Sequence, residues 1–180
     1  MVRMEHLLLR SPTRSDVAIM TASASDAAAQ QWLGWREHEL TSDSRRESLL
    51  GRQPGQGRVQ ATKATAPWHL IAIDRATGLV AGGVGGNPAI GDVGGWLAPR
   101  FRGRHLGAEL FAGAAQFVHY HLGEAHVLAG TEPANTAAVH ALLSAGYTPT
   151  DGPGRHQLPD GRVVPSRWFG HTAARPTRCG

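Results

Sequence analysis

The interpretation of the whole chain starts from one stretch, Trp96-Leu-Ala-Pro-Arg-Phe-Arg-Gly-Arg-His-Leu-Gly-Ala108. It begins where an apolar run from Asp92 predicts a strand, and it ends where apolar residues start to recur at helical spacing. A glycine-containing turn before a helix points several backbone N–H groups toward one place, at the positive end of the helix dipole. Arginines beside such a turn can donate charge-assisted hydrogen bonds to a phosphate group. The stretch therefore predicts an anion-binding turn, and the alternative is a turn that needs glycine only for its backbone.

The segments on either side predict a sheet with helices on it. The long helix carries Leu106, Leu110 and Phe111 on one apolar face, and a short strand at 125–130 follows it. A strand, a helix and a second strand in this order require a parallel pair. Strands at 6–10, 68–74, 79–84 and 163–169, and a hairpin around Pro159-Asp-Gly161, add antiparallel neighbours. The fold class is α+β, with a mixed, mostly antiparallel central sheet and flanking helices.

The first third of the chain shows helix starts and one long polar stretch. Thr13 and Asp16 have the spacing of a capping box, and Ser25 is a cap candidate for a helix that ends near Gly34. Residues 44–50 predict a further helix. Residues 51–66, rich in glycine, glutamine and arginine, predict a long loop.

Length and composition limit the class of protein. The 180 residues fit one domain, expected at 1–171, with a flexible C-terminal tail at 172–180. Hydrophobic residues are 41% and charged residues 18% of the chain, which is typical of a globular protein and not of a disordered one. The single cysteine, Cys179, excludes a disulfide framework. No apolar run is long enough to span a membrane, so a cytoplasmic location is expected.

The charge is carried by arginine. The net charge is +4, and Lys63 is the only lysine among the 18 basic residues. Basic side chains gather in residues 42–66, in 155–180 and in the trio Arg100, Arg102 and Arg104. This distribution predicts a phosphate-bearing ligand and keeps nucleic acid open as a partner.

Four pieces of sequence, in this order and spacing, resemble the GNAT acyltransferase superfamily. They are the opening Leu7-Leu-Leu-Arg10, the strand end Trp96-Leu-Ala-Pro99, the Arg102-Gly-Arg turn, and the stretch Asn135-Thr-Ala-Ala-Val-His-Ala-Leu-Leu-Ser-Ala-Gly-Tyr147. The likeness runs from about His6 to Phe169 and is greatest to the branch of ribosomal-protein and N-terminal-amine acetyltransferases.

The resemblance implies that the two parallel strands splay apart and that the pantetheine arm of coenzyme A lies between them. Acetyl-coenzyme A is then the cosubstrate, and no metal ion is expected. The cofactor-binding residues that the resemblance implies are Trp96, Leu97, Ala98, Arg102, Arg104, His105, Leu106, Gly107, Ala108 and Asn135.

The sequence departs from the family pattern at two positions. His105 stands where the family usually has the middle glycine of its turn, and Ala138 stands where many relatives have serine. A side chain at position 105 either crowds the pyrophosphate or donates a hydrogen bond to it.

Candidate catalytic and substrate residues follow from position. Glu132 is a candidate base, Ser144 and His140 are candidate proton donors to the leaving thiolate, and Trp32 and Trp35 are candidate substrate contacts. Each has a structural alternative: a helix-start carboxylate, a solvent-facing side chain or a packed aromatic residue. Tyr147 is interpreted as core. A metal site at His119, His121 and His126 is rejected, because residues two apart on a helix do not share a face.

Three functions follow as hypotheses. The first is an N-acetyltransferase that moves an acetyl group from acetyl-coenzyme A to a primary amine of a small molecule or peptide. The second is an aminoacyl-tRNA-dependent transferase on the same fold, with tRNA bound through the basic stretch 42–66. The third is a non-catalytic acyl-coenzyme A-binding module. Dimers are frequent in the family, so a homodimer is also an expectation of the resemblance.

Overall fold

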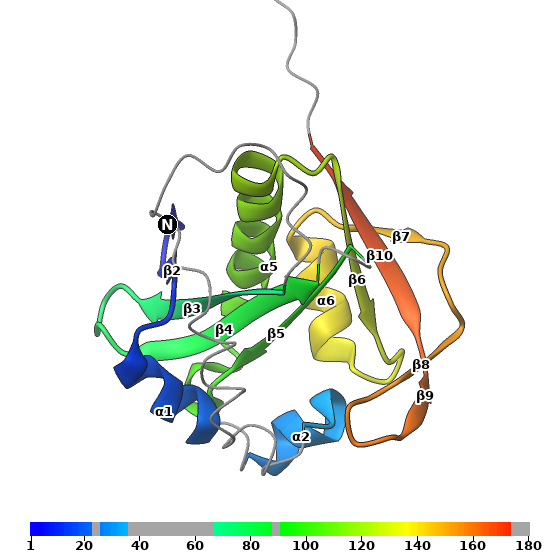
Figure 1. Cartoon of the computed structure of the whole chain (residues 1–180), viewed down its shortest axis with the longest axis horizontal. Helices are drawn as coiled ribbons and strands as arrows, with labels where there is room; N and C mark the ends of the chain where they lie inside the picture. The colour runs from blue at the N-terminus through cyan, green and yellow to red at the C-terminus, as the bar shows by residue number, and fades with distance from the viewer. Residues whose placement is uncertain (23–25, 36–66, 88–90, 174–180) are drawn as a thin grey trace, which may run out of the picture.

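The computed structural model of the chain describes residues 1–22, 26–35, 67–87 and 91–173. Its central feature is an eight-stranded sheet in the order β1-β2-β3-β4-β5-β6-β10-β7 (Figure 1). All neighbours in it are antiparallel except β5 and β6, which are parallel, so the predicted mixed sheet is confirmed. Its strands are β1 (Val2–Arg3), β2 (Leu7–Arg10), β3 (Trp68–Asp74), β4 (Val80–Asn87), β5 (Asp92–Leu97), β6 (His126–Thr131), β7 (Thr148–Thr150) and β10 (Arg167–Thr172).

Helices pack on both faces of this sheet. In the described ranges the α-helices are α1 (Arg14–Ala22), α2 (Ala27–Leu33), α5 (Leu106–Phe117) and α6 (Thr136–Ser144). Strand β3 shows how two cores arise from one strand. Its residues Leu70 and Ala72 belong to the core beneath α5, while Ile71 packs with Val17 of α1 and with Trp96. Because alternate side chains point to opposite faces, a strand buried on both sides reads as the continuous apolar run seen in the sequence.

The predicted strand–helix–strand unit is formed by β5, α5 and β6. A 3₁₀ turn at Pro99–Phe101 leads from β5 toward α5. The helix ends at Phe117, and the chain continues as a π-helical turn, Val118–Leu122, that Gly123 closes with a φ of 75°. The spacing of the apolar residues predicted a helix here, but it did not predict the change from α-helix to π-helix.

Several boundaries differ from the prediction. The cap of α2 is Asp26, whose side chain accepts from Ala28 N at 3.2 Å, and not Ser25. The run 163–169 is two strands, because β9 (Val163–Pro165) pairs with β8 (Arg155–Gln157) in a separate two-stranded sheet. The predicted turn at Pro159-Asp160-Gly161 does join β8 to β9.

The C-terminal boundary differs from the prediction, and some predicted segments lie outside the described residues. Thr172, placed in the tail by the sequence, is the last residue of β10, and Ala173 N donates to Ala125 O at 3.0 Å. The predicted helix at 44–50, the loop at 51–66 and the tail beyond 173 lie outside the described residues. Within the described ranges, no helix combines the length and the apolar character needed to cross a bilayer.

Candidate active site

The parallel strands β5 and β6 separate soon after they meet. Their only paired residues are Asp92 and Leu128, and Leu128 N donates to Gly91 O at 2.9 Å. Beyond that point the two strands diverge as a V, with α6 visible between them (Figure 1). A cavity of about 310 Å³ lies in the V, and α2, α5 and α6 complete its walls. The sheet is therefore open where the resemblance implied a splay.

Strand β5 forms one wall with little side-chain cover. An added Cβ at Gly94 would meet nothing within 4 Å, so the cavity reaches the backbone there. Ala98 N donates to Ala81 O at 2.8 Å, toward β4. Because backbone groups alternate along a strand, the N–H groups of Gly95 and Leu97 point the other way, toward the cavity.

This alternation bears on the backbone contacts expected of two residues. The N–H groups of Trp96 and Ala98 point toward β4, so they are not the donors that face the cavity. Trp96 lines the cavity and its side chain packs against α1, whereas Ala98 is not among the residues that line the cavity.

The turn before α5 provides the expected N-terminal tip of a helix. Gly103 and His105 both have positive φ, 71° and 58°, and Leu106 begins the helix. The imidazole of His105 is exposed and does not line the cavity, so it does not close the tip. Gly107 lies so close to α6 that an added Cβ would be 3.0 Å from Ala141 Cβ. The glycine thus allows α5 and α6 to meet at the mouth of the V.

The other predicted residues of this turn have different surroundings. Arg100 and Arg104 are exposed and stack on the ring of Phe101, at 5.0 and 5.6 Å from its centroid. Leu106 is buried in the core, and Ala108 N donates to His105 O at 3.2 Å.

Arg102 lines the cavity but already has partners. Its Nε donates to Leu97 O at 2.9 Å, and its guanidinium forms an ion pair with Asp26, the cap of α2. The guanidinium holds the pKa of Asp26 below its usual value. Arg102 therefore fixes α2 beside the end of β5, and the phosphate contact expected of it stays a prediction.

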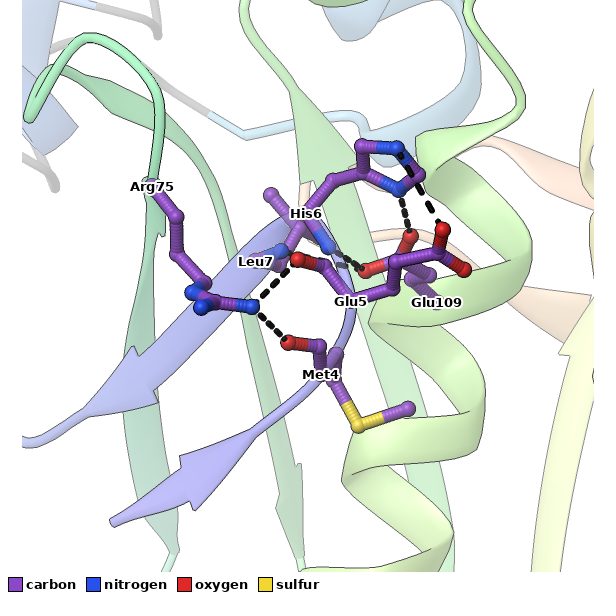
Figure 2. Close-up of polar contacts among 6 residues, drawn as sticks. All are labelled: Met4, Glu5, His6, Leu7, Arg75 and Glu109. Carbon is purple, nitrogen blue, oxygen red and sulfur yellow. Dashed lines mark hydrogen bonds and ion pairs between the residues drawn. The ribbon is translucent and has the colours of Figure 1, made fainter.

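The first turn of α5 is held by the N-terminal segment (Figure 2). Glu109 accepts from His6 N at 2.9 Å and from Leu7 N at 3.1 Å, and it bonds His6 Nδ1 at 2.5 Å. Burial acts to raise the pKa of Glu109, but these bonds outweigh it and lower the pKa. Arg75 donates to Met4 O at 2.8 Å and also binds Glu5 O, which fixes the same loop from the other side.

Strand β6 and α6 form the opposite wall. Asn135 lines the cavity and caps α6, accepting from Ala138 N at 3.2 Å through Oδ1. Its amide nitrogen, which the cap does not use, can donate to a ligand. Glu132 and Ala138 also line the cavity. The candidates Ser144 and His140 are exposed on α6 and outside the cavity lining, so the structure does not bring them to the site.

The early helices contribute one of the two predicted tryptophans. Trp32 of α2 lines the cavity, whereas Trp35 packs with Leu33 against the core around Trp96. Tyr147 is core, as predicted: its hydroxyl donates to Phe111 O at 3.4 Å, and burial raises its pKa.

The three histidines of the rejected metal site have separate neighbours. His119 hydrogen-bonds His171 at 2.9 Å, the ring of His121 lies beside that of Phe117, and His126 lies 3.3 Å from Thr172 Oγ1.

One titratable residue of the cavity lining was missed by the sequence analysis. His156 of β8 lines the cavity, and its Nδ1 is buried. The turn at 159–161 predicted the hairpin that carries it, but nothing in the local pattern shows that this hairpin lies against α2.

The comparisons with known proteins agree with this geometry. Residues 6–148 match the family described as the acetyltransferase (GNAT) domain. The chain belongs to this family. No curated protein matches the sequence closely enough to count as a relative.

Solved GNAT structures share the fold at low sequence identity. Spermidine N-acetyltransferase from Vibrio cholerae, in complex with CoA and spermine, is 15% identical with a TM-score of 0.71, over 94% of this chain and 96% of that one. Ribosomal-protein-S5-alanine acetyltransferase from Vibrio fischeri is 14% identical with a TM-score of 0.69, over 94% of each chain. An aminoglycoside acetyltransferase in complex with coenzyme A is 18% identical with a TM-score of 0.65, over 92% and 94%. At this identity the likeness supports the fold and no particular acceptor.

Proposed function

We propose that this GNAT protein transfers an acetyl group from acetyl-coenzyme A to a primary amine by direct attack. The observation that carries the proposal is the V between β5 and β6, with a cavity in it and the N-terminal tip of α5 at its open end. A thioester arm needs such a slot, and a pyrophosphate needs such a tip. The structural neighbours that are complexed with coenzyme A have the same fold.

The residues present fit this cosubstrate. The bare backbone at Gly94 leaves room for the arm, and the amide of Asn135 lies on the opposite wall. The first-turn N–H groups of α5 and the exposed Arg100 and Arg104 offer donors to phosphate. Acetyl-coenzyme A supplies an acyl group activated as a thioester.

The chemistry asked of the chain is positioning and charge stabilisation. The N–H groups of Gly95 and Leu97 can donate to the carbonyl oxygen of the acyl group as negative charge develops on it. The surrounding walls hold the amine against the carbonyl carbon, which replaces a bimolecular encounter. Leu110 and Phe111 of α5 give the same space an apolar wall.

The charges in the cavity favour a cationic acceptor. Glu132 is a carboxylate on the lining, while the guanidinium on the lining, Arg102, is paired with Asp26. Because an alkyl amine is protonated before it reacts, the net field of the described lining attracts it. The structural neighbours act on a polyamine, on aminoglycosides and on a ribosomal protein, which are all amine acceptors.

Calorimetry with acetyl-coenzyme A tests the proposal. We expect one site with a dissociation constant in the micromolar range, and release of free thiol when polyamines, aminoglycosides or short peptides are added. No binding at hundreds of micromolar contradicts the proposal. Tight, salt-dependent binding of aminoacyl-tRNA instead of acetyl-coenzyme A would indicate the transfer hypothesis with a tRNA donor. Binding without turnover on any amine would indicate the non-catalytic module.

A further inference from the structure

His156 has an unusual environment for a surface-hairpin histidine. It is half-buried and lines the cavity, and its Nδ1 is a buried atom with no hydrogen-bond partner in the described structure. Buried polar atoms nearly always have a partner, so an unpaired one in a cavity wall is where a ligand is expected to supply it.

The position of His156 is fixed from two directions. It pairs with Val164 of β9 in the two-stranded sheet, and the turn of that hairpin is tied to α2. Arg162 donates to Gln30 O and Gln31 O, both at 3.1 Å, at the C-terminal end of α2. The same helix carries Trp32 on the cavity wall. The hairpin that carries the imidazole is therefore attached to the helix that carries the indole.

Other charged groups interact with the imidazole or belong to the same cavity. Asp92 at the start of β5 interacts electrostatically with His156; burial raises the pKa of Asp92, and the imidazole opposes this. Glu132, after β6, and Arg102, before α5, line the same cavity, and Asp26 of α2 pairs with Arg102. The neutral form of an imidazole has one ring nitrogen that can accept a proton.

We propose that Nδ1 of His156 is the base that takes the proton from the acceptor amine. The proposal rests on the acetyl transfer proposed above. The amine nitrogen bonds to the thioester carbonyl carbon, the C–S bond breaks, and its electron pair leaves on sulfur. A protonated acceptor first gives one proton to Nδ1, which releases it to water, and the second nitrogen proton, lost after the attack, goes to the thiolate. This role requires the imidazole tautomer with its own proton on Nε2.

Two variants separate this role from a structural one. His156→Gln keeps a polar side chain of similar reach but cannot accept a proton at neutral pH, and His121→Gln is the matched control on the exposed π-helical turn. For His156→Gln we expect a kcat about 100-fold lower, unchanged acetyl-coenzyme A binding by calorimetry, and loss of the acid limb of the kcat/KM profile against pH. His121→Gln should match the wild type in all three.

A further readout tests the proton directly. An acceptor of low basicity, already uncharged at the assay pH, should lose much less rate in His156→Gln than a strongly basic alkyl amine. Imidazole added to His156→Ala should restore part of the rate. If a variant fails to fold, the pH profile of the wild type still tests the proposal. A wild-type kcat/KM that does not fall at low pH overturns it.

The outcomes distinguish the two proposals. Wild-type rates and pH profile in His156→Gln would overturn the role of His156 and leave the acetyl transfer standing. A wild-type protein that binds no acetyl-coenzyme A would overturn both.

Discussion

His105 has a backbone conformation that its residue type disfavours. Its φ is 58°, and it is the only non-glycine residue with positive φ among the described ranges. In this left-handed region a Cβ crowds the following carbonyl, so glycine is the usual choice. The strain is located at the N-terminal tip of α5, beside the cavity.

Replacing this residue should therefore stabilise the protein. We expect His105→Gly to increase the free energy of unfolding by up to about 1 kcal/mol, because the strain is removed. We also expect it to tighten acetyl-coenzyme A binding, because the backbone can approach the pyrophosphate more closely. Thermal melting and calorimetry measure the two effects. His105→Ala is the control, since it removes the imidazole and keeps the Cβ, and an equal gain in that variant would contradict the strain argument.

Gly94 and Gly95 are neighbours with opposite surroundings. A Cβ at Gly94 meets nothing within 4 Å, whereas one at Gly95 would lie 3.1 Å from Leu110 Cδ2 and 3.2 Å from Gly83 O. The absence of a side chain at Gly94 therefore leaves space for a ligand, and its absence at Gly95 leaves space for Leu110 to pack.

The pair gives a test of the cavity as a binding site. Gly94→Val should keep the melting temperature of the wild type and weaken acetyl-coenzyme A binding at least about tenfold, because its side chain enters the space of the ligand. Gly95→Ala should lower the free energy of unfolding by about 1–3 kcal/mol through overpacking. Calorimetry and chemical denaturation separate the two effects. Undiminished binding in a folded Gly94→Val would show that the ligand lies elsewhere.

At the scale of one element, the start of α1 shows a capping box extended by an ion pair. Asp16 accepts from Thr13 N at 2.7 Å and from Thr13 Oγ1 at 2.6 Å, and Arg10 donates to it at 2.6 and 3.1 Å. Asp16 is only 5% exposed. The pattern of Thr13 and Asp16 predicted the box, but the link to Arg10 of β2 is a tertiary contact that no spacing rule contains.

This carboxylate should make the protein sensitive to acid. Burial acts to raise the pKa of Asp16, but the bonds from Arg10 and Thr13 outweigh it and lower the pKa to about 2. A lowered pKa means that the stabilisation is complete above the unfolded pKa and disappears as the pH falls toward 2. We expect the wild type to lose about 2 kcal/mol more than Asp16→Asn between pH 5 and pH 2. Urea denaturation across this range measures it, and parallel curves for the two proteins would contradict the assignment.

The elements show what local sequence can and cannot predict. The strand before Pro99 and the helix after His105 were predicted because turn residues and apolar periodicity are local signals. The division of 163–169 into β9 and β10 was not predicted, because a run of alternating residues does not show where a strand changes partners. The same limit hid His156, whose role depends on where its hairpin lies and not on its neighbours in sequence.

At the scale of the whole molecule, the cavity lies between two parts of one sheet. The strands β1 to β5 form one part, and β6, β10 and β7 form the other. Since β5 and β6 pair at a single position, the contact of α5 with α6 is a second link between the two parts. Whatever fixes α5 therefore fixes the mouth of the site.

The contact between His6 and Glu109 is one such attachment, and it titrates. The hydrogen bond to Glu109 raises the pKa of His6 above its ordinary value, with burial opposing it. A raised pKa means that the stabilisation is complete below the unfolded pKa of about 6.5 and is lost as the pH rises through the folded pKa. The lowered pKa of Glu109 limits this stabilisation at low pH, because the contribution of the carboxylate is lost as the pH falls through that pKa.

The pair should therefore stabilise the protein most in mildly acidic solution. We expect the melting temperature of the wild type to fall between pH 6 and pH 9 by more than that of His6→Gln, because only the wild type loses the charge on residue 6. The control, His140→Gln, changes an exposed histidine on α6 and should follow the wild type. In Glu109→Gln the larger fall in melting temperature between pH 6 and pH 9 should also disappear, since the imidazole then has no carboxylate to bind. Identical pH dependence in the wild type and His6→Gln would show that the attachment of α5 depends on the backbone bonds from His6 and Leu7 alone.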